Sequence, residues 1–326
     1  MRVYIIRRLL LIIPTVLLTS IIIFITIRLI PGSIIDIMVE QFGAYAKVDR
    51  AAVENELGLN VPIYIQYGRW VGVVPQADGK ISGVMEGNLG DSLWHGTPVI
   101  SEIESSWPVT FELAVLGLII SQAIALPIGI YSSIRQDTWG DYVARTFAIL
   151  CIAVPGFWLG TMIVVFPSIW WGYSPPITLI PFIANPIGNL KMFIIPAIVL
   201  GMSMAGISMR MTRTMMLEVL RQDYIRTAWA KGLRERVVVM RHALRNALIP
   251  VITIIGMQVP VMVGGEVIIE NIFNLPGMGR LITTATLDRD YTIVSGTMLV
   301  FGIVMVLINL LVDLTYGYLD PRVNYK

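Results

Sequence analysis

The sequence predicts an all-α integral membrane protein with six transmembrane helices, and three observations carry that prediction. The composition is apolar: 56% of the 326 residues are hydrophobic and only 14% are charged, whereas a soluble domain has about 25% charged residues. The mean hydropathy is +0.74. Six apolar runs are each long enough to cross a hydrocarbon core of about 30 Å at about 1.5 Å per residue. Basic residues gather in one stretch between two of these runs, as they do on the inner side of a membrane.

The first apolar run extends from about Leu9 to Ile27, after a start that carries Arg2, Arg7 and Arg8. A secretory signal peptide has a shorter apolar core, of about 7–15 residues, and ends at a small-residue cleavage site. No such site is clear here, so we expect a retained first span with the N-terminus on the cytoplasmic side. Arg28 then lies at the far interface with its aliphatic stem extending toward water, and a substrate contact is the alternative.

Residues Gly32 to Pro108 form a sizeable segment that is not expected to cross the membrane. They carry ten acidic residues against four basic ones. Val48–Leu57 has a helix-forming composition, and Gly87–Ser92 has the composition of a turn. The turn lacks the Gly-Lys-Ser/Thr ending of a phosphate-binding loop, so it is not interpreted as a nucleotide site. The segment is either a small folded cap on the outer side or a docking surface for an external protein.

Five further spans follow. We place them at Val109–Tyr131, Tyr142 to about Pro167, Met192 to about Met209, Leu248–Ile269 and Thr292–Tyr316. Pro155 and Gly156 predict a kink within the third span, and Gly201 and Gly206 would allow a neighbouring helix to approach the fourth span closely. Six crossings place both termini on the same, cytoplasmic side.

The stretch from Arg210 to Pro250 is the longest polar interruption in the second half of the chain. It holds nine basic and three acidic residues, so we expect it to be a cytoplasmic loop. Ile225, Ala228, Trp229 and Leu233 recur at helical spacing and predict a short helix with one apolar face, interrupted near its end by Gly232. That face either enters a groove on a partner protein or lies on lipid headgroups.

Two strings within this stretch resemble the EAA loop of ABC-importer permeases, in the version found in the dipeptide/oligopeptide/nickel family. They are Tyr224–Leu233 (YIRTAWAKGL) and Arg241–Pro250 (RHALRNALIP). The Glu-Ala-Ala that names the loop is Arg226-Thr227-Ala228 here. In that family the loop contains a coupling helix that docks into an ATPase subunit. The resemblance assigns coupling to Tyr224, Ile225, Arg226, Thr227, Ala228, Trp229, Gly232 and Leu233.

Motifs elsewhere extend the resemblance over the whole chain. Gly87–Ser92 is similar to the family's Gly-x-Leu-Gly-x-Ser element, and Glu270–Leu281 is similar to its E-x-x-F-x-x-P-G-x-G-x-L element. The resemblance implies the type I importer permease fold with an external insertion between the first two helices. The implied organisation is a cytoplasmic start and first helix at 1–31, an extracytoplasmic insertion at 32–108, and a five-helix core at 109–326 with the coupling loop at about 210–250.

Ionisable groups are almost absent from the centres of the expected spans. Gln122 and Gln258 are the clearest polar residues there, and they either hydrogen-bond between helices or line a translocation path. A single cysteine, Cys151, and two distant histidines, His95 and His242, provide no basis for a metal site. No Walker A pattern and no His-Glu-x-x-His motif occur. We therefore expect no cofactor in this chain, and energy for active transport must come from another subunit.

The resemblance implies a permease subunit of an ATP-driven importer in the cell inner membrane, surrounded by lipid and not itself an enzyme. Its implied partners are a second homologous permease, two ATP-binding subunits that hold ATP and Mg, and an extracytoplasmic substrate-binding protein. No nucleic acid is suggested by a net charge of only +2. Di- or oligopeptides lead as solutes, with nickel, glutathione or oligosaccharide as alternatives. An ion-coupled carrier is disfavoured by the empty span centres, and a passive channel would not explain the basic stretch.

Overall fold

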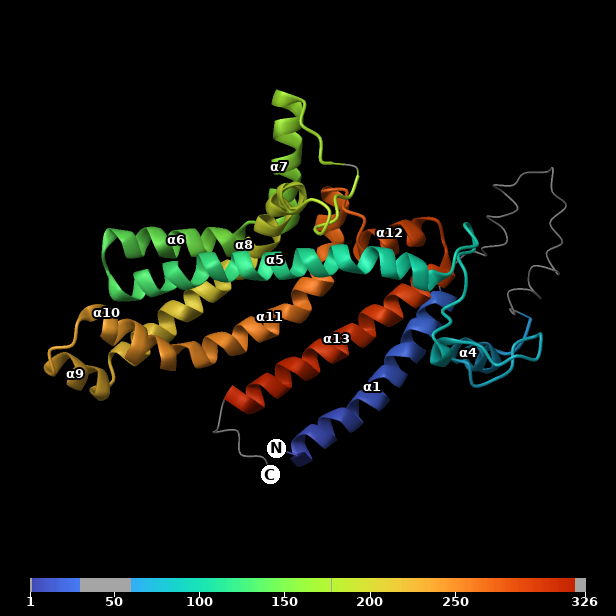
Figure 1. Cartoon of the computed structure of the whole chain (residues 1–326), viewed down its shortest axis with the longest axis horizontal. Coiled ribbons are helices and arrows are strands. Elements are labelled where there is room, and N and C mark those ends of the chain that lie inside the picture. The colour runs from blue at the N-terminus through green and yellow to red at the C-terminus, as the bar shows by residue number, and fades with distance from the viewer. Residues whose placement is uncertain (1, 30–59, 177, 320–326) are drawn as a thin grey trace. The chain divides into compact units, whose positions relative to one another are not determined.

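The computed structural model describes residues 2–29, 60–176 and 178–319, and in these ranges every regular element is a helix (Figure 1). The chain divides into two compact units, which are described separately: unit 1 is built mainly from Pro108–Arg280, and unit 2 mainly from Arg7–Trp107 and Leu281–Val306. The elements are α1 (Arg2–Arg28), α4 (Ile63–Val71), η2 (Val84–Glu86), α5 (Val99–Ile134), α6 (Trp139–Ala153), α7 (Gly156–Trp171), α8 (Pro186–Leu220), α9 (Asp223–Ala230), α10 (Glu235–Val237), η3 (Val238–Ala243), α11 (Leu244–Ile272), α12 (Met278–Leu287) and α13 (Tyr291–Leu319).

Length and apolar composition make five stretches of the described chain able to cross a membrane. They are helices α1, α5, α8 and α13 and the continuous segment Glu235–Gly264. Helices α6 and α7 pass the same criteria together, although they are bent by 90° at the break between them. The expected count of six spans is reached when this bent pair is one span.

The expected kink at Pro155 is a complete break between α6 and α7. Val154 leaves the helix with φ −81° and ψ 118°, and Pro155 is also extended. A residue before proline is pushed out of the α region by the proline ring, and proline fits the start of the next helix because it lacks an N–H group. Helix α7 consequently turns away from α6 at nearly a right angle (Figure 1).

Several helices extend beyond the apolar runs that mark them in the sequence. Helix α5 begins at Val99, inside the segment assigned to the insertion, and α8 continues to Leu220. The basic stretch is therefore mostly helical, and the loop expected over 210–250 is reduced to the connection around α9. Hydropathy locates the part of a helix that needs an apolar environment, whereas the helical backbone satisfies its own hydrogen bonds on either side of that boundary.

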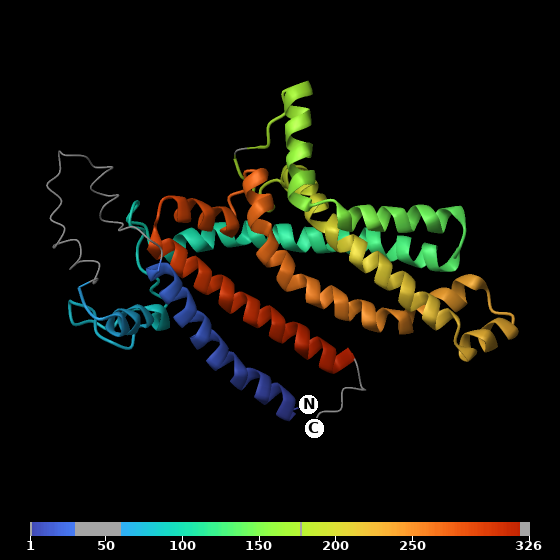
Figure 2. The same ribbon diagram turned by 180° about the vertical axis from the view of Figure 1, so that it is seen from behind.

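Small residues bring α8 close to its neighbours in unit 1. Helix α8 packs along both α6 and α11, and the two opposite views show these helices side by side (Figure 2). A Cβ atom on Gly201 would lie 2.7 Å from the carbonyl oxygen of Gly117 in α5, and one on Gly206 would lie 2.8 Å from the carbonyl oxygen of Ala148 in α6. The prediction that these two glycines permit close helix approach is confirmed.

In unit 2, the chain before α5 packs against α1 through aromatic rings. Phe24 of α1 lies 5.4 Å from Tyr67 and 5.7 Å from Trp70, measured between ring centroids. The Tyr67 hydroxyl also shares a 2.8 Å hydrogen bond with Ser20. These contacts fold α4 onto the first helix, so this part of the insertion has its own packed structure. The helix expected at Val48–Leu57 lies outside the described residues.

The turn predicted at Gly87–Ser92 is joined to the start of α13 through Asp290. The Asp290 carboxylate is buried and accepts hydrogen bonds from the Ser92 hydroxyl at 2.6 Å, the Leu93 amide at 3.0 Å and the Ile293 amide at 3.1 Å. The last of these bonds satisfies an amide in the first turn of α13, as a helix N-cap does. The serine that ends the turn motif therefore donates a hydrogen bond to the residue that caps the start of α13.

Candidate functional site

Helix α9 is a separate short helix between two membrane-compatible segments. It runs from Asp223 to Ala230 and follows α8 after a two-residue turn. Gly232 lies beyond its end with φ +75°, a conformation that glycine adopts at little cost, and its missing side chain would face open space. The predicted short helix is confirmed, but it ends at Ala230, so Gly232 and Leu233 lie beyond it.

The apolar face of α9 packs against the rest of the same chain. Ile225 is fully buried and Ala228 is 6% exposed. The buried cluster around them comprises Met216, Ile225, Ala228, Val238, Val239, Ala243 and Ala247, with Ile130, Ile134, Met215, Val219, Leu220, Leu233 and Leu244 packed against it. Ile225 and Ala228 therefore face the interior of this chain rather than its surface, and their assignment to coupling stays a prediction. The amphipathic pattern was identified correctly, but the end of α8 and the π-helical η3 fold back and cover it.

The side chains on either side of this buried stripe, including Trp229 from the predicted apolar face, remain accessible. Tyr224 is 44% exposed and Trp229 is 46% exposed, and Arg226 and Thr227 are also exposed. The Tyr224 hydroxyl accepts a 2.8 Å hydrogen bond from the Asn246 side chain of α11. Of the predicted coupling residues, these four and Gly232 lie on the surface, Leu233 is half-buried, and Ile225 and Ala228 anchor the helix.

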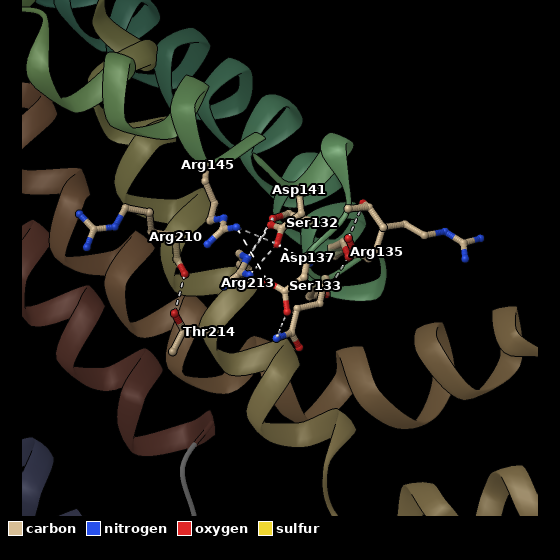
Figure 3. A network of polar contacts seen from close by, with 12 residues as sticks. Ser132, Ser133, Arg135, Asp137, Asp141, Arg145, Arg210, Arg213 and Thr214 are labelled. Atoms are coloured by element: carbon tan, nitrogen blue, oxygen red, sulfur yellow. Dashed lines mark hydrogen bonds and ion pairs between the residues drawn. The ribbon is translucent and has the colours of Figure 1, made fainter. Parts of the chain in front are cut away.

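A buried ion pair between Asp141 and Arg213 joins α6 to α8 (Figure 3). The sequence analysis did not single it out. Asp141 has no exposed side-chain surface, and its two oxygens each accept a 2.8 Å hydrogen bond from the guanidinium of Arg213. Such a bidentate pair fixes orientation as well as distance. The Ser132 hydroxyl of α5 donates to the same carboxylate and accepts a 3.0 Å bond from Arg213. We call Asp141, Arg213 and Ser132 the ionic cluster.

Two further groups surround the ionic cluster. The Asp137 amide, in the turn between α5 and α6, donates to Asp141 at 3.0 Å, and Arg145 lies 3.5 Å from the same carboxylate. The signal in the sequence was an acid in the first turn of α6, four residues before Arg145. The apolar run ends at about Met209, so the sequence alone places Arg213 in the loop, whereas α8 continues to Leu220.

A second polar cluster lies within the bundle and contains no charge. Gln122 of α5 donates to the Ser208 hydroxyl of α8 at 3.4 Å, and Gln258 of α11 donates to the same hydroxyl at 3.2 Å. Gln258 also reaches the carbonyl oxygen of Met204 at 3.3 Å. We call Gln122, Ser208 and Gln258 the neutral cluster. The two glutamines predicted as path or packing residues are thus brought together by a serine that the sequence analysis did not name.

The element Glu270–Leu281 is organised by its glutamate. The Glu270 carboxylate is buried and accepts hydrogen bonds from the Thr110 hydroxyl at 2.6 Å and the Arg280 amide at 3.0 Å. The Thr110 oxygen accepts a 2.8 Å bond from the Met278 amide, at the start of α12. A Cβ atom on Gly277 would lie 2.2 Å from the glutamate oxygen, so the motif's glycine is required by the carboxylate beside it.

Comparison with known proteins places this geometry in a family. Residues 125–325 match the family model Binding-protein-dependent transport system inner membrane component, and residues 1–114 match the model of the corresponding N-terminal region. The chain is 36% identical to the dipeptide transport system permease protein DppB of Escherichia coli K12, over 99% of both chains. It is 33% identical to the glutathione transport system permease protein GsiC of Pectobacterium atrosepticum, also over 99% of both, and 38% identical to a Brucella suis peptide transport system permease protein over 96% of both.

Solved structures support the fold. The structure of the MetNI methionine ABC transporter in an inward-facing conformation matches with a TM-score of 0.54 at 15% identity, over 68% of this chain and 97% of that one. An amino acid ABC transporter with histidines matches with a TM-score of 0.52 at 13% identity, over 67% and 94%. Both structures share the all-α fold of this chain, in agreement with the family match. The chain belongs to the family of inner membrane components of binding-protein-dependent transport systems, as the membrane-spanning permease of an ABC importer.

Proposed function

We propose that the exposed face of α9 is the surface through which this permease engages an ATP-hydrolysing subunit. The supporting observation is the position of a short helix between two spanning segments, anchored by Ile225 and Ala228 and exposing Tyr224, Arg226 and Trp229. An anchored helix transmits force into the chain that holds it, while an exposed aromatic residue such as Trp229 supplies contact area at an interface. Gly232 and Leu233 form the turn by which the chain leaves α9.

The remaining subunits follow from the family. Two ATP-binding subunits would hold ATP and Mg and perform the hydrolysis, a second homologous permease would complete the pathway, and an extracytoplasmic binding protein would deliver the solute. Helix α9 would face the cytoplasm, since the exposed basic residues concentrate around it. With six spans, both termini would lie on that same side. Lipid would contact the exposed apolar faces of the spanning helices.

Di- or oligopeptides are the proposed solutes. The relatives from Escherichia coli and Brucella suis are named for dipeptide and peptide transport, and glutathione, named for the Pectobacterium relative, is itself a peptide. Gln122 and Gln258 both donate a hydrogen bond to the Ser208 hydroxyl of α8. We therefore favour helix–helix packing over solute contact for both glutamines. The solute would cross between this chain and the partner permease.

The coupling proposal is tested by charging the exposed face of α9. Trp229→Glu replaces an exposed aromatic side chain of the proposed interface by a carboxylate, and an unpaired charge buried there is costly. A loss of about 2–4 kcal/mol would weaken subunit binding roughly 30- to 1000-fold. The measurement is pull-down of ATPase subunits by the tagged permease, together with uptake of labelled dipeptides by proteoliposomes containing the whole complex.

Trp139→Glu is the matched control, because Trp139 is 81% exposed at the first residue of α6, outside α9. We expect it to keep its ATPase subunits. Full ATPase retention and full uptake by Trp229→Glu would remove α9 as the coupling surface and favour the alternative that it rests on lipid headgroups.

Orientation has a separate test. Lys80→Cys and Lys231→Cys, each in a Cys151→Ala background, place one thiol on each of two exposed segments. We expect an impermeant reagent to label them from opposite sides of the membrane. Labelling of both from the same side would contradict the six-span topology.

A further inference from the structure

The ionic cluster lies within one helical turn of the cluster that anchors α9. Arg213 precedes the buried Met216 by three residues on α8, and residues at this spacing are neighbours on a helix surface. Met216 packs in the same buried cluster as Ile225 and Ala228 of α9. Helix α8 therefore connects the apolar anchor of α9 to the carboxylate of Asp141 on α6 over a very short path.

Helix α5 is held at the same level by two kinds of contact. Its Ser132 hydroxyl bonds to both members of the ion pair, while Ile130 and Ile134 pack against the α9 anchor. A Cβ atom on Gly129 would lie 2.8 Å from the Thr212 Cβ atom of α8, so α5 and α8 touch closely here. The α5–α6 hairpin is thus joined to α8 by tight packing on one arm and by the ion pair on the other.

Stability alone does not account for a buried ion pair. Desolvating two charges offsets much of their mutual attraction, and well-packed apolar residues of similar volume are often as stabilising. The bidentate geometry supplies what apolar packing lacks, which is a fixed direction and register between two helices. Arg213 of α8 donates hydrogen bonds to Asp141 of α6 and to Ser132 of α5, and these bonds leave the hairpin little freedom to shift along α8.

We propose that Asp141 and Arg213 are positioning residues that make the α5–α6 hairpin follow α8 and α9 when α9 is displaced by its ATPase partner. This inference rests on the proposed coupling function of α9. Loss of the pair would leave α9 able to bind and to move, but α6 would no longer move in register with it. Hydrolysis would then continue while transport per ATP falls.

The test uses Asp141→Leu/Arg213→Met, which removes both charges and leaves neither buried alone. The complex is purified by a tag on the permease and placed in proteoliposomes. We expect ATPase subunits to be retained and ATP to be hydrolysed, while labelled dipeptide uptake per ATP falls about 5- to 150-fold, the range of typical coupling free energies. A purely structural role predicts that a double variant as stable as the parent transports normally, and that result would overturn the proposal.

Arg213→Lys is the alternative test variant if the double variant does not assemble with its ATPase subunits. It keeps the charge but loses the planar fork, so we expect intact assembly with lowered uptake per ATP. Normal coupling in this variant would overturn the proposal. Asp137→Asn is the control, because its side chain is largely exposed while its backbone bond to Asp141 is kept.

A distance measurement that does not depend on the solute reports the movement of the α5–α6 hairpin relative to α9. Spin labels on Trp139→Cys and Lys231→Cys, in a Cys151→Ala background, report the distance between the start of α6 and the end of α9. We expect one narrow distance distribution in the parent complex, unchanged by ATP, and a shifted or broadened one with ATP in the double variant. An ATP-dependent distance in the parent, or identical distributions in both, would overturn the proposal. A parent chain that retains no ATPase subunits would instead refute the proposed function itself.

Discussion

The ionic cluster and the neutral cluster solve the same packing problem with different chemistry. Each joins α5 and α8 to a third helix, which is α6 for Asp141–Arg213 and α11 for Gln122–Ser208–Gln258. The ionic cluster has 2.8 Å bidentate bonds, whereas the bonds of the neutral cluster are 3.2–3.4 Å. Amide and hydroxyl groups can be placed among apolar helices at modest cost, while a charge requires a partner held in good geometry.

The difference shows how polar residues in a membrane bundle divide their tasks. The neutral cluster supplies contact between helices without demanding one geometry, and the side-chain oxygen of Gln122 is buried without a hydrogen-bond partner. The ionic cluster satisfies Asp141 with several donors and lies beside the anchored α9. We therefore expect substitutions in the neutral cluster to lower stability little. Removal of either Asp141 or Arg213 alone should lower it severely.

The largest effect is expected from Arg213→Met, because it leaves the buried Asp141 carboxylate without its guanidinium. Removing one partner of a buried pair costs about 3–5 kcal/mol. The free energy of unfolding, from denaturant titration in detergent, measures this loss. The double variant Asp141→Leu/Arg213→Met should recover most of it. A double variant less stable than the single one would contradict the buried-charge explanation.

Gly201→Ala is expected to have the next largest effect on stability. It tests whether close packing of α5 and α8 contributes more to stability than the neutral cluster does. The added Cβ atom would lie 2.7 Å from the Gly117 carbonyl oxygen, and overpacking of this kind costs about 1–3 kcal/mol. Gly156→Ala is the matched control, since its Cβ atom would meet only the Ser203 hydroxyl at 3.7 Å. Equal thermal stability of the two variants would show that the α5–α8 approach is more yielding than the geometry indicates.

A smaller effect is expected from Gln258→Leu, which removes two donated hydrogen bonds from the neutral cluster. Interhelical hydrogen bonds in membranes contribute about 0.6 kcal/mol on average and about 1.7 at most. Dipeptide uptake should stay near the parent value, because both donated bonds of Gln258 go to α8, at Met204 and Ser208. A fall in uptake without a fall in stability would return Gln258 to the translocation path.

The smallest effect is expected from Asp137→Asn. The Asp137–Arg145 pair is 4.0 Å long, and the side chains are 64% and 37% exposed, so its contribution should lie within about 0–1 kcal/mol. Asparagine also tolerates the positive φ of 60° at this position. A thermal unfolding scan beside Arg213→Met provides the comparison. A loss comparable to that of Arg213→Met would mean that the outer charges belong to the ionic cluster.

Part of the site could be predicted from local sequence. The spacing of Ile225 and Ala228 identifies a helix with one apolar face, and Gly232 marks its end, because both signals depend on residues within a few positions of one another. The pairing of Asp141 with Arg213 joins positions far apart in the chain. It depends on α8 continuing past its apolar run, which hydropathy does not reveal.

The sequence by itself determined the all-α membrane class, the apolar runs, the break at Pro155 and the family motifs, since composition, helical period and proline geometry act locally. Only the tertiary structure decided which surface covers the apolar face of α9, which acid meets Arg213, and that Ser208 lies between Gln122 and Gln258. Each of these is a choice among many possible partners. The close approach of α8 to α5, α6 and α11 selects one of them, because side chains can bond only where the backbones of their helices meet.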